Sequence, residues 1–312
     1  MQIDRRGLFA AFAGLSAIAA ATPDPTEVID IWPDGPPGGV PKSLTQKTVE
    51  RAKPGLPGDR AVFNVTRPTL TVFRPAEPNG RAVLLTPGGS YGRVVVDKEG
   101  FELGRWLAAR GVTAHVLYYR LPADGWAAGP DAALQDAQRA LRLVRADRST
   151  RGPVGLVGFS AGGHVAAMLA TRHGETTYPA RDATDRLSAR PDAVGLVYPL
   201  ISMRPPAAHA ESRGNLLGQA PTEAQVRAYS LEDRAGPQVP PTFLVHAHDD
   251  ATVPIDNSLL LHAALRRAGI PVEAHYFQEG GHGFGLRGTV AKPIAVWPEL
   301  FWAWWMRRGL AA

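Results

Sequence analysis

Apolar runs and amphipathic stretches alternate along most of the chain. Continuous Val, Leu and Ala runs are typical of strands buried on both faces of a sheet, and such runs or shorter strand-like segments occur at residues 81–87, 112–120, 153–157, 193–200, 241–247 and 272–277. Between them, stretches with the helical spacing of apolar residues occur at residues 101–111, 131–147, 164–171 and 257–269. This alternation predicts a doubly wound α/β fold, with a mainly parallel sheet covered by helices on both faces.

Two segments depart from this alternation. Residues 22–59 are rich in Pro and Gly and have no sustained period, so we expect an irregular lead-in to a main domain at residues 60–312. Residues 201–240 are rich in Pro, Arg and His, and we expect a long irregular loop that acts as a lid or contacts a substrate. The spacing does not show which of its candidate residues would touch a substrate: Met203, Arg204, His209 or Tyr229.

A Trp-rich pattern closes the chain. Its large apolar residues follow the spacing i, i+3, i+4, i+7, i+8: Trp297, Leu300, Phe301, Trp304 and Trp305. That spacing places them on one face of a helix. We therefore expect this face to pack on the core, rather than to form a platform on which sugars stack.

Composition excludes several classes of function. The chain has 312 residues, of which 45% are hydrophobic and 20% charged, as in an ordinary globular protein with one large core. Its formal charge of +5 comes from scattered Arg, without the basic block that a nucleic-acid groove needs, so no nucleic-acid partner is expected. Because there is no Cys, disulfides, thiolate metal ligands and Cys nucleophiles are excluded.

The N-terminus has the layout of an export signal. Arg5 and Arg6 precede a weakly hydrophobic run at residues 8–21, and about 14 residues are fewer than the roughly 20 that span a bilayer as a helix. The paired arginines resemble the twin-arginine signal of bacteria. We therefore predict a signal peptide at residues 1–21, a mature chain that begins near Thr22 with no stable membrane insertion, and a periplasmic or secreted protein.

Residues 158–162 read Gly-Phe-Ser-Ala-Gly and match the pattern G-x-S-x-G. An isolated Ser in a Gly-rich turn is usually a helix cap. Here an apolar strand precedes the motif and a helical stretch follows it, which is the context of a nucleophile elbow. The hydroxyl of Ser160 would then be exposed at the carboxyl edge of the sheet, where the helix N-terminus favours negative charge.

A nucleophilic Ser needs a base and an acid to activate it. Asp250 follows the strand at residues 241–247, and His282 follows the strand at residues 272–277, so both lie at the edge where Ser160 emerges. The order Ser, Asp, His is that of α/β-hydrolases. Asp249 competes with Asp250 as the acid, and the pattern D-x-x-V-P that begins at Asp250 favours the second of the pair.

The remaining candidate histidines are interpreted as structural. His282 is preferred as the base because flanking glycines leave its imidazole free to approach Ser160. His246 and His248 belong to the strand and loop before the acid, and lining the site is their alternative role. His164 lies in the helix after the elbow, where it would pack or cap.

An ester hydrolase also needs hydrogen-bond donors for the oxyanion. The segment Pro-Gly-Gly-Ser at residues 87–90 follows the strand at residues 81–87 and, taken alone, is only a turn. Together with the elbow, it is placed to offer the N–H groups of Gly89 and Ser90, with that of Ala161 completing an oxyanion hole. The four-part pattern favours catalysis over a purely structural role.

These motifs resemble the secreted acetyl xylan esterase-like and carbohydrate esterase branch of the α/β-hydrolases, close to the hormone-sensitive-lipase type. The resemblance covers nearly all of the chain from Asn64 and is carried by residues 64–76, 84–100, 105–122, 136–145, 158–164, 249–254 and 280–284. It implies an α/β-hydrolase catalytic domain that cleaves acetyl or other short-acyl esters, often on plant cell-wall polysaccharide, without a metal or organic cofactor. A third glycine is frequent in the oxyanion segment of such enzymes, and Ser90 replaces it here.

Two other functions stay open at this point. A serine peptidase of the prolyl-oligopeptidase type has a similar elbow, although residues 22–59 are too short for the propeller that such enzymes usually carry. A non-catalytic ligand-binding α/β protein is the alternative from another class. The substrate is expected to be a small-molecule or oligosaccharide ester, and neither the acyl chain length, the alcohol half nor the oligomeric state follows from the sequence.

Overall fold

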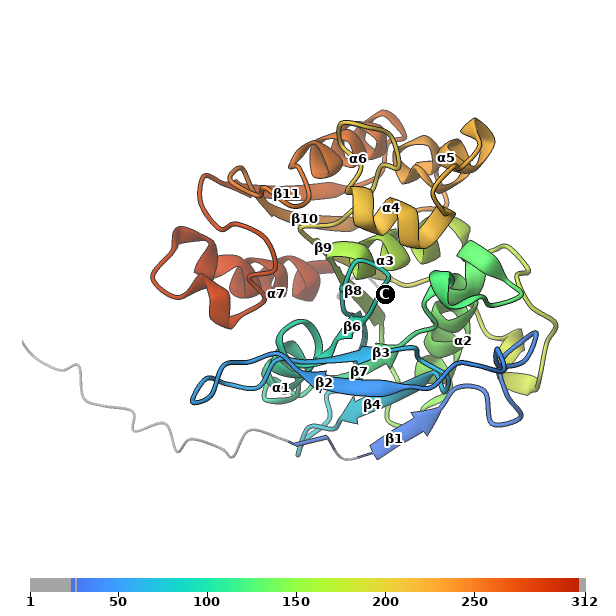
Figure 1. The fold of residues 1–312 in the computed structure, drawn as a ribbon. Coiled ribbons are helices and arrows are strands. Elements are labelled where there is room, and N and C mark those ends of the chain that lie inside the picture. The colour runs from blue at the N-terminus through green and yellow to red at the C-terminus, as the bar shows by residue number, and fades with distance from the viewer. Residues whose placement is uncertain (1–23, 26, 309–312) are drawn as a thin grey trace, which may run out of the picture.

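The computed structural model describes residues 24–25 and 27–308. The predicted signal peptide, residues 1–21, lies outside the described residues. The central sheet follows the order β1 (Glu27–Asp30), β4 (Thr69–Phe73), β7 (Thr113–Tyr118), β5 (Ala82–Thr86), β8 (Val154–Phe159), β9 (Ala193–Val197), β10 (Thr242–Ala247) and β11 (Val272–Phe277). From β7 to β11 all neighbours are parallel, and β4 pairs antiparallel with both β1 and β7 (Figure 1).

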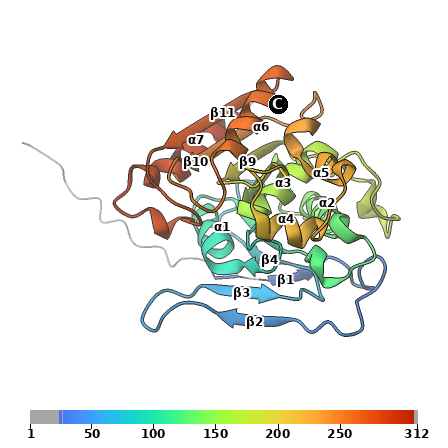
Figure 2. The ribbon, with the colours of Figure 1, turned by 45° about the horizontal axis from the view of Figure 1, so that its top comes forward.

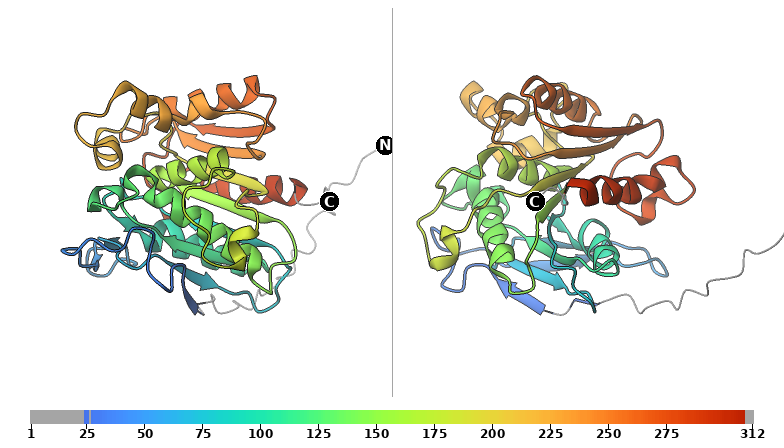
Figure 3. Two further views of the ribbon diagram at one scale, coloured as in Figure 1. Left: turned by 90° about the vertical axis from the view of Figure 1, so that its right-hand side faces the viewer. Right: turned by 180° about the vertical axis from the view of Figure 1, so that it is seen from behind.

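Helices cover both faces of this sheet, as predicted. On one side lie α1 (Glu102–Ala108) and α7 (Trp297–Arg308), and on the other lie α2 (Ala132–Ala146) and α3 (Ser160–Arg172) (Figure 1). A further helix, α6 (Asp256–Arg267), connects β10 to β11. The view from behind shows α7 and α1 on the same side of the sheet (Figure 3, right). The prediction of a mainly parallel α/β fold is confirmed.

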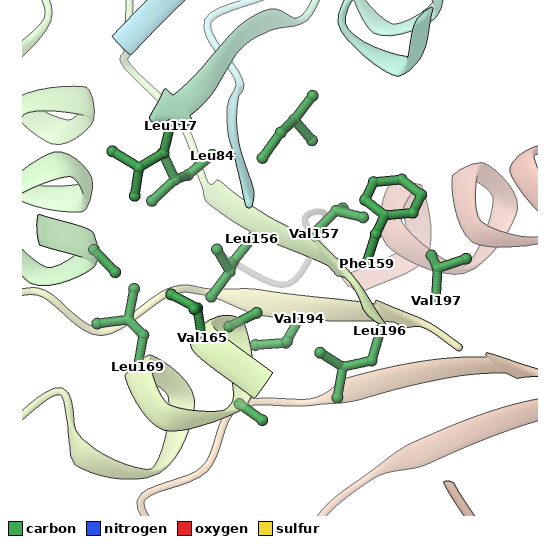
Figure 4. Close-up of a cluster of buried hydrophobic side chains, with 14 of the residues drawn as sticks. Leu84, Leu117, Leu156, Val157, Phe159, Val165, Leu169, Val194, Leu196 and Val197 are labelled. Atoms are coloured by element: carbon green, nitrogen blue, oxygen red, sulfur yellow. The ribbon is translucent and has the colours of Figure 1, made fainter. Parts of the chain in front are cut away.

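The core is built by the alternation of side chains along the strands. Leu156 of β8 points toward α3, where Val165 and Leu169 lie, whereas Val157 and Phe159 point to the opposite face (Figure 4). All five side chains are fully buried. Strands that are apolar at every position therefore fill both layers of the core, because successive residues face opposite sides of the sheet.

The Trp-rich helix packs as its spacing predicts. Trp297, Phe301, Trp304 and Trp305 of α7 are buried, and Leu300 is partly buried against the same core. The ring of Trp297 meets that of Phe159 edge-on at a centroid distance of 6.1 Å. This face therefore anchors α7 beneath the end of β8.

Residues 22–59 are largely irregular where the structure describes them, as expected, but they also contain two short strands that the composition did not predict. They include β1, which extends the central sheet, and β2 (Lys47–Glu50), which forms a small second sheet with β3 (Arg60–Phe63) and β6 (Val94–Val95) (Figure 2). Trp32 is buried, and its Nε1 donates a 2.6 Å hydrogen bond to Asp136. Strands of four residues are too short to show a period, and the pairing partner of β1 lies far away in the sequence.

Residues 201–240 also differ from the expected irregular loop. They contain α4 (Ala210–Leu217), α5 (Glu223–Tyr229) and a 3₁₀ turn at Leu231–Arg234. Thr222 and Gln225 form a capping box that starts α5, because each side chain bonds the backbone N–H of the other. The pattern T-x-x-Q at residues 222–225 predicts the start of a helix, whereas the Pro residues around it favour a loop.

Candidate active site

Ser160 lies at the sharp turn between β8 and α3. Its φ of 52° is in the left-handed region, which costs a non-Gly residue free energy and is typical of a nucleophile elbow. A Cβ on Gly162 would lie 2.1 Å from Thr86 O, and one on Gly158 would lie 2.5 Å from Gly162 O. Both glycines of the motif are thus required by close backbone contact, which lets the strand turn directly into the helix.

The structure brings Ser160, His282 and Asp250 into one hydrogen-bonded row. Ser160 Oγ lies 2.9 Å from His282 Nε2, and His282 Nδ1 lies 2.7 Å from Asp250 Oδ2. The other carboxylate oxygen, Asp250 Oδ1, accepts hydrogen bonds from Thr252 N and Val253 N, both at 2.9 Å. Each side chain comes from the loop after a parallel strand, at the edge of the sheet predicted from the sequence.

Asp250 carries its charge inside the protein. Burial alone would raise its pKa, but hydrogen bonds from His246 and His282 outweigh burial and hold the pKa of Asp250 well below its usual range. Its side chain is fully buried. The carboxylate is therefore ionised at neutral pH and faces the imidazole that contacts Ser160.

His246 contacts the same carboxylate from behind. Its Nε2 lies 3.1 Å from Asp250 Oδ2 and 3.0 Å from Val253 O, and its Nδ1 lies 2.8 Å from Ser258 Oγ. Because a carbonyl oxygen can only accept, Nε2 carries a proton and points it at Val253 O and the Asp250 carboxylate. The sequence identified His246 as structural but gave no sign that it holds Asp250.

Asp249 lies outside this row and fixes the loop of His282. Its Oδ1 accepts hydrogen bonds from Gly280 N at 2.8 Å and from Gly281 N at 2.7 Å. His248 is exposed, and its backbone N donates to Phe277 O at 2.7 Å. The structure therefore assigns the carboxylate next to His282 to Asp250, while Asp249 supports the segment that carries His282.

The segment expected to hold the oxyanion lies beside Ser160. Gly89 and Ser90 line the same cavity as Ser160 and His282. Within the part of the chain that the structure describes, the N–H groups of Gly89 and Ser90 make no hydrogen bond. Ala161 directly follows Ser160 and is buried at the start of α3. The three predicted donors thus come from the two segments that flank the nucleophile.

His164 packs behind this segment, as expected of a structural residue. Its Nε2 lies 2.8 Å from Tyr229 O and must donate to it, so its Nδ1 accepts the hydroxyl proton of Tyr91 at 2.7 Å. Complete burial lowers the pKa of His164 to about 4, which keeps the ring neutral. His164 therefore connects the oxyanion segment to α5.

Glu99 is the site residue that sequence reasoning missed. It lies in a π-helical turn at Asp97–Phe101 and lines the cavity, although it is only 4% exposed. Its Oε2 accepts from Gly88 N at 2.8 Å, and its Oε1 accepts from Tyr198 Oη at 3.0 Å. No spacing in the sequence distinguishes it, since it follows an apolar strand in a stretch with mixed charges.

The cavity over Ser160 has a volume of about 260 Å³ and includes residues of α4. His209 and Glu211 line it, and Asn215 Nδ2 donates a 2.8 Å hydrogen bond to Ser90 O. Of the other residues considered in this segment, Met203 is buried and Arg204 pairs with Glu232. The segment at residues 201–240 thus contributes to the lining of the site through His209 and the start of α4.

The described residues hold no cluster of three or more His, Cys, Asp or Glu that could ligate a metal ion. Among the same residues, no helix is long and apolar enough to cross a membrane.

The elbow at Ser160, the row of Ser160, His282 and Asp250, and the parallel sheet define the chain as an α/β-hydrolase. The model of the BD-FAE family matches residues 77–265. The chain belongs to this family, within the esterase branch of the α/β-hydrolases, which confirms the resemblance seen in the sequence.

Two curated proteins are similar to a large part of the chain. It is 30% identical over 225 residues to an acetylxylan esterase of Xylanibacter ruminicola, covering 70% of this chain and 44% of that protein. It is 34% identical over 205 residues to the endo-1,4-beta-xylanase B of Butyrivibrio fibrisolvens, covering 64% of this chain and 32% of that protein. The chain therefore spans less than half the length of both curated relatives.

A solved structure matches over almost the whole chain. The acetyl ester-xyloside bifunctional hydrolase from Caldicellulosiruptor lactoaceticus superposes with a TM-score of 0.71 at 30% identity, covering 94% of this chain and 100% of that one.

Proposed function

We propose that the protein is a serine esterase that removes acetyl or other short acyl groups from xylan-like oligosaccharides or small esters. The observation that carries this proposal is the hydrogen-bonded row of Ser160, His282 and Asp250, which opens into one cavity with the N–H groups of Gly89 and Ser90. A nucleophile, a base, an acid and oxyanion donors are the complete set that acyl transfer requires.

The mechanism follows from these positions. Ser160 Oγ attacks the ester carbonyl while His282 Nε2 accepts its proton, and Asp250 stabilises the imidazolium that results. The N–H groups of Gly89, Ser90 and Ala161 stabilise the tetrahedral oxyanion. His282 then gives its proton to the departing alcohol oxygen, and the same cycle with water releases the acid from Ser160.

The names of the relatives support the choice of substrate. One is an acetylxylan esterase, and the solved structure compared above is an acetyl ester-xyloside bifunctional hydrolase. The cavity of about 260 Å³ beside Ser160 is small and partly lined by polar residues, which suits a short acyl group next to a sugar better than a long acyl chain.

Two assays test the proposal. A series of p-nitrophenyl esters from acetyl to octanoyl should show the highest kcat/KM at acetyl or propionyl, and acetylated xylan should release acetate. A dipeptide amide measured alongside separates an esterase from a prolyl-oligopeptidase-like peptidase. Failure of Ser160 to react with a fluorophosphonate probe in folded protein would overturn the esterase and favour a ligand-binding protein.

We also propose export through the twin-arginine route and a periplasmic or secreted location. The support is the sequence at residues 1–21, with Arg5 and Arg6 ahead of the short apolar run. Replacing both arginines with Lys should leave the full-length precursor inside the cell, detected by fractionation and by the mass of the chain. Normal export of that variant would exclude this route.

A further inference from the structure

A second cavity adjoins the catalytic one. It has a volume of about 460 Å³, within the range of small-molecule sites, and shares Arg51 and Lys98 with the cavity over Ser160. Its remaining lining comes mainly from the turn between β2 and β3 (Figure 2) and includes Lys53, Leu56 and Asp59. The N-terminal hairpin thus extends the active-site cleft beyond the catalytic serine.

Cationic side chains dominate the charge of this extended cleft. The basic residues that line the two cavities are Arg51, Lys53, Arg93, Lys98 and Arg287, and the acidic ones are Asp59, Glu99 and Glu211. An excess of positive charge in a concave site attracts anions and raises their local concentration.

The carboxylates of the cleft are already engaged. Asp59 pairs with Arg51 at 2.7 Å and lies 3.6 Å from Arg287, so two guanidinium groups flank it. Glu99 accepts hydrogen bonds from Gly88 N and from the Tyr198 hydroxyl. These contacts hold both carboxylates in place, and the five Lys and Arg side chains that line the cleft still outnumber its three acids.

Among the described residues, Lys98 and Lys53 are the cations of this lining that form no ion pair. Neither ammonium group makes a hydrogen bond or an ion pair with any described residue, and Lys98 lies at the junction of the two cavities. A Cβ on Gly283, the residue after His282, would lie 3.6 Å from Lys98 Nζ. The ammonium of Lys98 is thus close to the reacting centre, on the side toward the β2–β3 turn.

Arg93 adds a further donor to the catalytic cavity. Its Nε is buried without a hydrogen-bond partner among the described residues, and its guanidinium is only loosely paired with Glu211, at 3.7 Å. Arg93 lines this cavity together with Ser90 and Ser160. An anionic group on the substrate would therefore meet more than one cation in the cleft.

We propose that this cleft binds an alcohol half that carries a carboxylate, so that the preferred substrate is an acetyl ester on an oligosaccharide with a uronic acid unit. The proposal rests on the esterase function and names the substrate class of that site. Polysaccharides of plant cell walls carry their charge mainly as uronic acid carboxylates. Lys98 and Lys53 would contact the carboxylate while the acetyl group lies at Ser160.

A matched pair of substrates tests the proposal. An acetylated xylo-oligosaccharide with a uronic acid side group is compared with the same molecule after its carboxyl group has been reduced to the neutral alcohol. An exposed ion pair is worth up to about 1 kcal/mol, which is at most about fivefold per lysine, so with two lysines the wild-type ratio of kcat/KM, acidic over neutral, should be about fivefold. The ratio should fall toward one at high ionic strength, because salt screens exposed charges.

Variants then assign the preference to residues. K98Q and K53Q should each lower the ratio, the double variant should bring it close to one, and K98E should reverse it. Lys42 is an exposed lysine of the same N-terminal segment and lines neither cavity, so K42Q is the control and should keep the wild-type ratio.

The possible failures are distinguishable. A wild-type ratio near one, with rapid turnover of both oligosaccharides, overturns the acidic subsite and leaves the esterase standing. A high ratio that persists in the K98Q/K53Q variant overturns the assignment to these lysines. Absence of turnover of both oligosaccharides and of p-nitrophenyl acetate overturns the esterase function and, with it, the subsite.

Discussion

The carboxylate of Glu99 accepts a 2.8 Å hydrogen bond from the backbone N–H of Gly88. Its second oxygen accepts from the hydroxyl of Tyr198, and that hydroxyl in turn accepts from Gly285 N at 3.1 Å. One buried carboxylate thus connects the oxyanion segment to the loop of His282. The ring of Tyr198 also packs edge-on against His282, with a centroid distance of 4.9 Å.

Replacement of Glu99 should therefore impair catalysis by disturbing both loops. Glu99→Gln keeps one oxygen acceptor but loses the charge, so we expect a fall of about tenfold in kcat/KM on p-nitrophenyl acetate, and about 100-fold for Glu99→Ala. The acid limb of kcat/KM should also move to lower pH in Glu99→Gln, because a negative charge that favours the protonated imidazole is removed.

Among the described residues, the titratable and charged groups that contact His282 or line its cavity are Asp250, Tyr198, Glu99, Lys98, Arg51, Arg93, His209 and Glu211, and the pH profile reports on this environment. A Glu99 that only supported the fold would lower kcat without moving the acid limb. An unchanged profile in a folded Glu99→Gln variant would restrict Glu99 to that structural role.

The residues of the catalytic row should act as one unit. Ser160→Ala and His282→Ala should each cost about four to six orders of magnitude in kcat, and the double variant should be little worse than either. Asp250→Asn should lower kcat by about four orders of magnitude, because the amide disturbs the tautomer and orientation of the imidazole without removing it. The measurement is kcat on p-nitrophenyl acetate with circular dichroism as a check of folding; wild-type turnover in folded Ser160→Ala contradicts the mechanism.

Asp249 supplies the matched control for Asp250. Asp249→Asn keeps a carbonyl oxygen that can accept from Gly280 N and Gly281 N, so kcat should stay within about threefold of wild type. Asp249→Ala removes this acceptor and leaves two donors without their partner, so we expect a loss of about tenfold and a more mobile His282 loop. If Asp249→Asn loses most of its kcat while Asp250→Asn keeps it, the acid is Asp249.

The buried ring of His164 should make the free energy of unfolding depend on pH. Its pKa is about 4 in the folded protein because burial disfavours the charged ring, and about 6.5 in the unfolded chain. The unfolded chain then binds more protons between pH 4 and 6.5, so this contribution is complete above pH 6.5 and is lost as the pH falls toward 4.

From pH 7 to 5 this single group should lower the free energy of unfolding by about 2 kcal/mol. Urea unfolding of wild type and His164→Gln at both pH values measures it, since the variant lacks the titrating ring. An equal pH dependence in the two proteins would show that His164 is not the responsible group.

The sequence predicted those parts of the site that lie on regular parallel strands. Ser160, Asp250 and His282 each follow a strand long and apolar enough to be recognised, and parallel strands bring their carboxyl ends to one edge. Gly89 and Ser90 were found for the same reason. Their catalytic roles stay predictions until the variants are measured.

Contacts between distant segments could not be predicted in this way. Glu99 bonds to Gly88, 11 residues away, but also to Tyr198, 99 residues away, and no local pattern records the second contact. The four residues of β1 reveal a strand only through their pairing with β4. The capping box at Thr222 was a local signal, and it could have corrected the interpretation of residues 201–240.

The hydrogen bond between Ser160 and His282 joins residues 122 positions apart in the chain. Closing so long a loop lowers the entropy of the chain before the contacts that stabilise it have formed. Such pairings therefore form late in folding. During synthesis, β8 and its serine leave the ribosome well before β11 and the histidine loop are made. The protein therefore cannot cleave esters by this mechanism before the loop of His282 has been made, and the appearance of activity during refolding would time the docking of β11 and that loop.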